Sequence, residues 1–164
     1  MELLTGLLVL GHAVLGILFF CGLVGRGIVL ALAERAETTA AMRTLTKAAA
    51  PFEWMVIRVG FVAILLGVVV AIAEGRPFLG PLQGGRFDWL FASVVLLLTV
   101  APLPPLVFLP RGRVFEAALT DAAASGEITT ELRAAWRDPL TRAAHGWELI
   151  VLTSVLLLML AKPF

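Results

Sequence analysis

The sequence predicts an all-α integral membrane protein, a four-helix bundle with a cytoplasmic helical hairpin between its third and fourth spanning helices. Of the 164 residues, 60% are hydrophobic and only 15% are charged, whereas a soluble domain carries about 25% charged residues. The apolar residues also gather in long runs, and a helix needs about 20 of them to cross a bilayer. This composition excludes a soluble enzyme, a disordered chain and a nucleic-acid-binding module.

Four segments are long and apolar enough to span a bilayer, and together they leave little chain for anything else. The first contains Arg26 as its only permanent charge, and the third is uncharged but rich in proline toward its end. We therefore expect a single transmembrane domain over residues 1–164. The expected spans are residues 3–33, 51–73, 89–109 and 143–161.

The first apolar segment also has one feature of a secretory signal, because residues 31–33 resemble a small-residue cleavage site. Its leading flank holds Glu2 and no basic residue, however, and the apolar run is about twice the usual length. We expect this segment to be a retained helix.

The basic residues are divided unevenly between the two sides of the membrane. Eight lie in the connections 34–50 and 110–142, and three lie in the middle loop and at the C-terminus. Under the positive-inside rule, this distribution places the two longer connections in the cytoplasm and both termini outside it. The formal net charge is only +1, so no nucleic acid is expected as a partner.

The connection 110–142 is expected to form a helical hairpin. Residues 114–124 are rich in alanine, Gly126 ends that helix, and Thr129 or Thr130 caps a second short helix before Pro139. Phe115, Ala118, Leu119 and Ala122 share one face of the first helix by their spacing. This face lies against headgroups or a partner, or belongs to a surface hairpin that only links two spans.

Five ionisable residues fall in the cytoplasmic leaflet of the predicted bundle. An ionisable side chain inside a bilayer costs a few kcal/mol on insertion scales, so each needs a partner or a function. We expect an interhelical ion-pair cluster, in which the ring of Trp54 covers the guanidinium of Arg58. The alternative, a proton or ion pathway, requires polar groups toward the opposite face, where they are sparse. The cluster comprises Arg26, Glu53, Arg58, His145 and Glu148.

Glycines recur along one face of the first helix. In lipid, small residues allow helices to approach closely, so this face should point at other helices, within the bundle or in a partner. The predicted helix-packing residues are Gly11, Gly16, Gly22 and Gly25.

His12 lies on the stripe beside these glycines, about nine residues or 14 Å from the outer boundary. An imidazole at this depth is able to ligate haem or copper, and neighbouring glycines admit a flat macrocycle. His145 is expected near the opposite surface, so an intramolecular bis-histidine site is not predicted, and Met159 is the one methionine of suitable depth. The alternative is a buried histidine that hydrogen-bonds a neighbouring helix.

Motifs of enzymes are missing from the sequence. It has no glycine-rich phosphate loop, no HExxH and no serine beside a histidine, and its single cysteine, Cys21, cannot form an intramolecular disulfide. We therefore expect no catalytic activity and no resident cofactor, apart from the haem or copper considered for His12.

Four short motifs together resemble a bacterial family of predicted integral membrane proteins of unknown function. They are the opening Leu-Gly-His-Ala at residues 10–13, the turn at 86–90, the loop at 124–128 and the closing Met-x-x-Lys-Pro at 159–163. Through His12 and the first-helix glycines, the chain is also distantly similar to the copper-resistance D membrane proteins. The resemblance implies a four-helix protein of the bacterial inner membrane and supplies no activity.

Two hypotheses of function follow. The first is a non-catalytic membrane subunit or scaffold that packs against other membrane proteins or a second copy in the bilayer. The second is a haem- or metal-binding membrane protein in which His12 is one ligand and a partner or second copy supplies the others.

Overall fold

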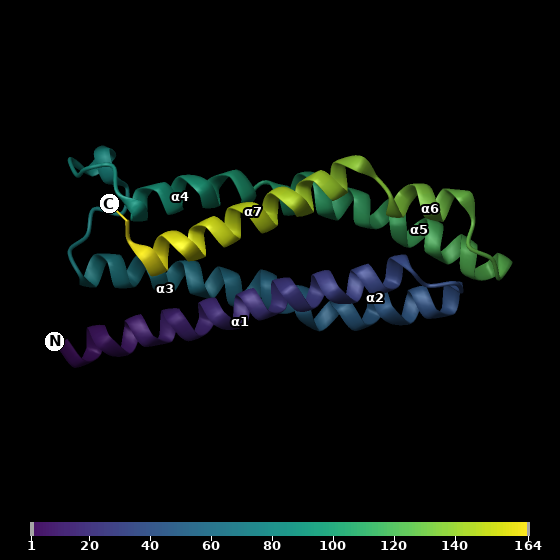
Figure 1. Cartoon of the computed structure of the whole chain (residues 1–164), viewed down its shortest axis with the longest axis horizontal. Coiled ribbons are helices and arrows are strands. Elements are labelled where there is room, and N and C mark those ends of the chain that lie inside the picture. The colour runs from purple at the N-terminus through teal and green to yellow at the C-terminus, as the bar shows by residue number, and fades with distance from the viewer. Residues whose placement is uncertain (1, 164) are drawn as a thin grey trace. The chain divides into compact units, whose positions relative to one another are not determined.

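The computed structural model describes residues 2–163, which are helical apart from short connections and contain no strand (Figure 1). Four helical segments of 32 to 37 residues are long and apolar enough to cross a membrane. The all-α prediction is thereby confirmed, and so is the presence of four helices able to span a membrane. The four helices are Glu2–Glu34, Thr39–Ala73, Trp89–Ser125 and Thr130–Ala161.

Each long helix after the first is divided into shorter elements. The complete order is α1 (Glu2–Glu34), α2 (Thr39–Trp54), η1 (Met55–Val59), α3 (Gly60–Ala73), η2 (Gly80–Gln83), α4 (Trp89–Val100), η3 (Pro104–Phe108), α5 (Leu109–Ser125), α6 (Thr130–Trp136) and α7 (Pro139–Ala161). Elements η1 and η3 are π-helical turns inside longer helices, whereas η2 is a short 3-10 helix.

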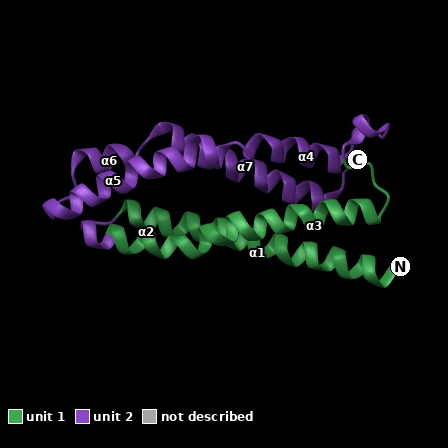
Figure 2. Cartoon of the chain, turned by 180° about the vertical axis from the view of Figure 1, so that it is seen from behind, with its two compact units in different colours: residues 1–35, 42–78 green, residues 36–41, 79–164 purple. Residues whose placement is uncertain are grey.

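The expected single transmembrane domain contains two compact units (Figure 2). The first unit comprises residues 1–35 and 42–78, and the second comprises residues 36–41 and 79–164. The first therefore holds α1 together with most of α2, η1 and α3, and the second holds everything from η2 to α7.

In the first unit, α1 packs antiparallel to the long helix made by α2, η1 and α3. Pro51 lies inside α2, and the π-helical turn η1 begins four residues later. A proline has no backbone N–H and its ring crowds the preceding turn, so it disturbs the regular ladder of helical hydrogen bonds. The helix continues through this disturbance, with one wide turn at residues 55–59.

In the second unit, α4 packs antiparallel to α7. The indole Nε1 of Trp147 donates to Thr99 Oγ1 at 3.2 Å, and Lys162 Nζ lies 5.4 Å from the ring centroid of Trp89. Asp88 caps α4 by accepting a hydrogen bond from the backbone N–H of Phe91 at 2.9 Å. The prolines at 102, 104 and 105 do not end this helix, because the π-helical turn η3 carries it on into α5.

The helical hairpin predicted for residues 110–142 is formed by α5 and α6. Gly126 ends α5 with a φ of 77°, a backbone conformation that favours glycine. Thr129 caps α6 by accepting a hydrogen bond from the N–H of Leu132 at 3.2 Å. The face of α5 that includes Leu119 and Ala122 is buried, and Phe115 makes an edge contact with Trp136 of α6 at 5.1 Å. At Phe115, this apolar face therefore packs against the second helix of the hairpin.

Candidate functional site

Two of the predicted packing glycines of α1 receive side chains of the helix opposite. A Cβ added to Gly22 would lie 2.8 Å from the Cβ of Met55, and one added to Gly25 would lie 2.5 Å from the ring of Phe52. Such separations leave no room for any side chain other than hydrogen. Gly22 and Gly25 therefore serve close packing inside the first unit, as small residues do in membrane helix pairs.

The opposite helix has matching glycines, Gly60 and Gly67, which were not among the predicted packing residues. The ring of Phe19 lies over Gly60, where an added Cβ would meet it at 2.7 Å, and the imidazole of His12 lies over Gly67, where the separation would be 2.8 Å. The signal available in the sequence is that these two glycines are seven residues apart, and so share one helix face.

The remaining glycines of α1 behave differently from Gly22 and Gly25. Gly11 is in close contact with Leu66, at 3.3 Å from an added Cβ, whereas Gly6, Gly16 and Gly27 have nothing within 4 Å of one. Gly16 and Gly27 are eleven residues apart, which is about three helical turns, so they lie on nearly the same side of α1. Gly27 and Ala31 are both exposed. Of the four predicted packing residues, Gly11, Gly22 and Gly25 thus contact the opposite helix, whereas Gly16 lies on an open face.

His12 is half-buried and is held by the helix opposite. Its Nδ1 lies 2.9 Å from the carbonyl oxygen of Ala63. A carbonyl oxygen only accepts hydrogen bonds, so Nδ1 carries the proton that is donated. In the neutral ring, Nε2 then has the lone pair. The structure thus contains the interhelical hydrogen bond expected of a structural histidine, and it also defines the nitrogen that is able to ligate a metal.

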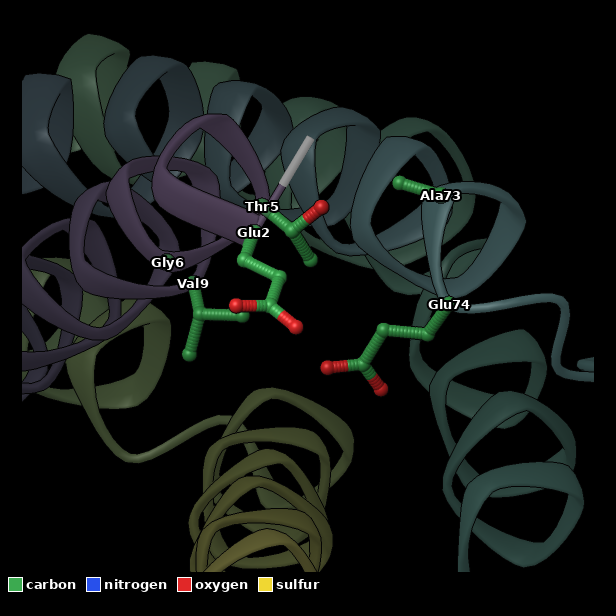
Figure 3. A pocket seen from close by; sticks show the side chains of 6 residues that line it. All are labelled: Glu2, Thr5, Gly6, Val9, Ala73 and Glu74. Atoms are coloured by element: carbon green, nitrogen blue, oxygen red, sulfur yellow. The ribbon is translucent and has the colours of Figure 1, made fainter.

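An open hollow of about 420 Å³ lies beside the N-terminal end of α1, lined by α1 and the end of α3 (Figure 3). Figure 3 shows the carboxylates of Glu2 and Glu74 turned toward the same space. Glu74 also pairs with Arg76, whose Nε lies 2.5 Å from its Oε2. The lining residues are Glu2, Thr5, Gly6, Val9, Ala73 and Glu74.

The five residues of the predicted ion-pair cluster are distributed over both units. Arg26 is 8% exposed and Glu148 is 5% exposed, so both are buried, as expected of charges that need partners. Glu53 and Arg58 are exposed. Because Arg26, Glu53 and Arg58 belong to the first unit and His145 and Glu148 to the second, the cluster as a whole stays a prediction.

Two local parts of this cluster are present in the structure. The guanidinium of Arg58 lies 5.4 Å from the ring centroid of Trp54, which confirms the predicted cation–π contact. In α7, His145 Nδ1 lies 3.4 Å from Glu148 Oε2. The ring of Phe108 stacks on this imidazole, with 4.4 Å between the centroids. The partner Phe108 was not foreseen, because it comes from the proline-rich turn η3.

A second polar group joins the hairpin to α7. Asp138 Oδ2 accepts hydrogen bonds from the hydroxyl and the backbone N–H of Thr141, at 2.7 and 2.8 Å, and Arg111 lies 3.2 Å from Asp138 Oδ1. The hydrogen bonds from Thr141, together with the positive charge of Arg111, hold the pKa of Asp138 below its ordinary value. The aspartate thus caps α7 in its ionised form.

The side chains of residues 2–163 include no group of three or more His, Cys, Asp or Glu residues that could hold a metal ion. Among the described residues, His12 therefore belongs to no such group. Cys21 is a free, exposed thiol. No family model, curated protein or solved structure matches the chain.

Proposed function

We propose that this chain is a non-catalytic integral membrane protein, a small subunit or scaffold whose first helix packs against another transmembrane helix. The observation that carries the proposal is that two open glycines lie on one side of α1. Gly16 and Gly27 lie on nearly the same side of the helix with nothing within 4 Å of an added Cβ, while Gly22 and Gly25 already serve the contact with α2 and η1.

Open glycines are poorly suited to face lipid, because they contribute little surface for packing against acyl chains. They do allow the backbone of another helix to approach closely, and Gly27 and Ala31 form a small-x-x-x-small pair of the kind found at such contacts. The partner helix belongs to another membrane protein or to a second copy of this chain. The positive-inside rule favours a bacterial inner membrane orientation with both termini outside the cytoplasm.

Gly27→Leu tests this proposal. The substitution fills the open face, and leucine inserts into a bilayer more readily than glycine, so the chain should reach the membrane normally. The mass of the complex, measured after extraction in native lipid discs, should fall to that of a single chain. Formation of a disulfide-linked dimer by a Gly27→Cys variant that lacks Cys21 would identify the partner as a second copy.

Gly146→Leu is the matched control, because Gly146 is another exposed helical glycine with nothing within 4 Å of an added Cβ. We expect it to leave the mass of the complex unchanged. If Gly27→Leu leaves that mass unchanged as well, or if the unsubstituted chain is already a monomer in native discs, the scaffold function is wrong.

A second candidate function is haem or metal binding through His12, and one observation favours it. The Ala63 carbonyl takes the proton of Nδ1 at 2.9 Å, which orients the ring and leaves Nε2 as the nitrogen with a lone pair. Metal-ligating histidines are commonly held in this way by a carbonyl on the other ring nitrogen. When bound, haem or copper would supply redox chemistry. The other ligands would have to come from a partner or a second copy.

The absorption spectrum of the natively purified protein separates the two candidates. A visible band that disappears in His12→Ala, and persists in Gly27→Leu, would support the second. A colourless, metal-free protein whose complex depends on Gly27 would support the first.

A further inference from the structure

The charges of the α5–α6 hairpin are segregated along its length. The first turn and a half of α5 contains Arg111 and Arg113, and its later turns contain Glu116 and Asp121. The order is reversed in α6, which has Glu131 in its first turn and Arg133 in its last turn, and is followed by Arg137 at its C-cap. Since the two helices are antiparallel, their basic ends meet at the base of the hairpin and their acidic ends meet at its tip.

Two contacts show that the basic ends lie at the same level. Arg111 pairs with Asp138 at 3.2 Å, so the start of α5 lies beside the start of α7. One turn further from the spans, Phe115 of α5 contacts Trp136 of α6 at 5.1 Å between ring centroids. Arg142 follows in the first turn of α7, where its N–H donates to the Asp138 carbonyl at 3.1 Å. We call Arg111, Arg113, Arg133, Arg137 and Arg142 the basic collar.

The basic collar coincides with the end of the apolar stretch. Residues 89–110 carry no charge, so Arg111 is the first charged residue beyond the third span. All five arginines are exposed. In the described part of the chain Arg111 pairs with Asp138, and the other four arginines make no ion pair. The collar thus presents four uncompensated guanidinium groups at the depth where lipid headgroups begin.

We propose that the basic collar binds the phosphate groups of anionic phospholipids. A guanidinium presents paired donors that match phosphate oxygens, and basic residues next to a spanning helix are attracted to anionic headgroups. The acidic tip strengthens the assignment to lipid. Glu116, Asp121, Glu127 and Glu131 are repelled by an anionic surface, so the hairpin stands away from the membrane and only its base contacts headgroups.

The other basic connection, residues 34–50, lacks the concentrated block of arginines found in the collar. Between residues 34 and 53, Arg35 is flanked by Glu34 and Glu37, and only Arg43 and Lys47 follow each other without an acidic residue between them. The basic residues there are fewer and less concentrated than in the collar, so we expect weaker selection of anionic lipids. This makes Arg35 and Arg43 a matched control for the basic collar.

Trp136 is a local reporter, because it lies beside the basic collar. In a chain carrying Trp54→Phe, Trp89→Phe and Trp147→Phe, its fluorescence is measured in discs of phosphatidylcholine containing a small fraction of dibrominated lipid. Brominated phosphatidylglycerol should quench Trp136 several times more strongly than brominated phosphatidylcholine. Since headgroup attraction is electrostatic, the ratio should fall toward one in concentrated salt. The discs present anionic lipid on both faces, so the result does not depend on which side is cytoplasmic.

Arg133→Gln together with Arg137→Gln should reduce the quenching ratio at least about threefold. Arg35→Gln together with Arg43→Gln removes the same charge and should leave the ratio unchanged. Equal quenching by both lipids in the otherwise unsubstituted chain would overturn the proposal, as would an equal loss in the control pair. If the double variant fails to fold, the salt dependence decides, because a ratio that does not respond to salt excludes headgroup binding.

Discussion

The imidazole of His12 is held by one hydrogen bond and one close contact, and both depend on the absence of a side chain at position 67. Nδ1 donates to the Ala63 carbonyl at 2.9 Å, and an added Cβ at Gly67 would lie 2.8 Å from the ring Cε1. A glycine in the interior of a helix ordinarily lowers stability relative to alanine. At position 67 the ring of His12 leaves no room for a larger residue, so replacing this glycine by alanine should lower stability instead of raising it.

We predict that Gly67→Ala lowers the free energy of unfolding by about 1–3 kcal/mol, because the added methyl group overpacks the helix pair and displaces the histidine. Thermal unfolding in detergent measures the change. Gly146→Ala is the control, since nothing lies within 4 Å of its added Cβ. It should be neutral or stabilising, by up to about 1 kcal/mol. Equal behaviour of the two variants would contradict the close packing of His12 on Gly67.

Asp138 gives a prediction of pH dependence at the same scale. Its hydrogen bonds from Thr141 and the charge of Arg111 lower its pKa in the folded protein below the ordinary 3.8. A lowered pKa means that the ionised cap stabilises the fold above pH 3.8, and that this contribution is lost as the pH falls through the folded value. Asp138→Ala should therefore lower the Tm at pH 7 and make a smaller difference near pH 3.

The control for this measurement is Asp121→Ala, which removes an exposed aspartate of the same hairpin. Its effect on the Tm should be small at both pH values. If Asp138→Ala lowers the Tm as much near pH 3 as at pH 7, the ionised cap is not what stabilises α7.

At the scale of an element, the π-helical turn η1 aligns the two halves of the second long helix with α1. In a regular helix, Phe52 and Gly60 would be separated by about 80° around the axis, whereas Gly60 and Gly67 differ by about 20°. All three contact α1, through Gly25, Phe19 and His12. Because a π-turn accommodates one extra residue, it restores an effective spacing of seven between Phe52 and Gly60.

Single-residue deletions test this alignment. Removing Ile57, an exposed residue of η1, should convert the wide turn to regular helix and preserve both contact faces. Removing Ile64, an exposed residue of α3, should rotate Gly67 by about 100° away from His12 and destabilise the pair. The Tm of the two deletion variants gives the comparison. A deletion of Ile57 that is as harmful as that of Ile64 would refute the register argument.

At the scale of the whole molecule, four helices that each cross the membrane once predict both termini on the same side of it. The eight-to-three division of basic residues predicts that residues 34–50 and 110–142 face the cytoplasm. In a background lacking Cys21, Ala40→Cys and Ser125→Cys should resist an impermeant thiol reagent applied to intact cells and react after lysis. Labelling of both positions by reagent applied from outside would show that the orientation is the reverse of the predicted one.

The helical class, the four apolar helices and the ends of the hairpin helices were all predictable from the sequence. These features follow from local rules, because twenty apolar residues suffice for a span and a glycine or threonine acts within a few residues of a helix end. The contact of Arg58 with Trp54 was predictable for the same reason, since four residues separate them. Gly126 and Thr129 accordingly occupy the capping positions that the sequence indicates.

Three features were not predictable from the sequence: which glycines are in close contact with another helix, how His12 is hydrogen-bonded, and where the charges of the hairpin converge. Each depends on pairing between segments that are distant in sequence, as with His12 and Ala63, which are 51 residues apart. Periodicity could not reveal that Gly60 and Phe52 share a face, because the π-helical turn between them changes the register. Close packing between helices selects partners by shape at the contact, and that shape exists only once both helices are in place.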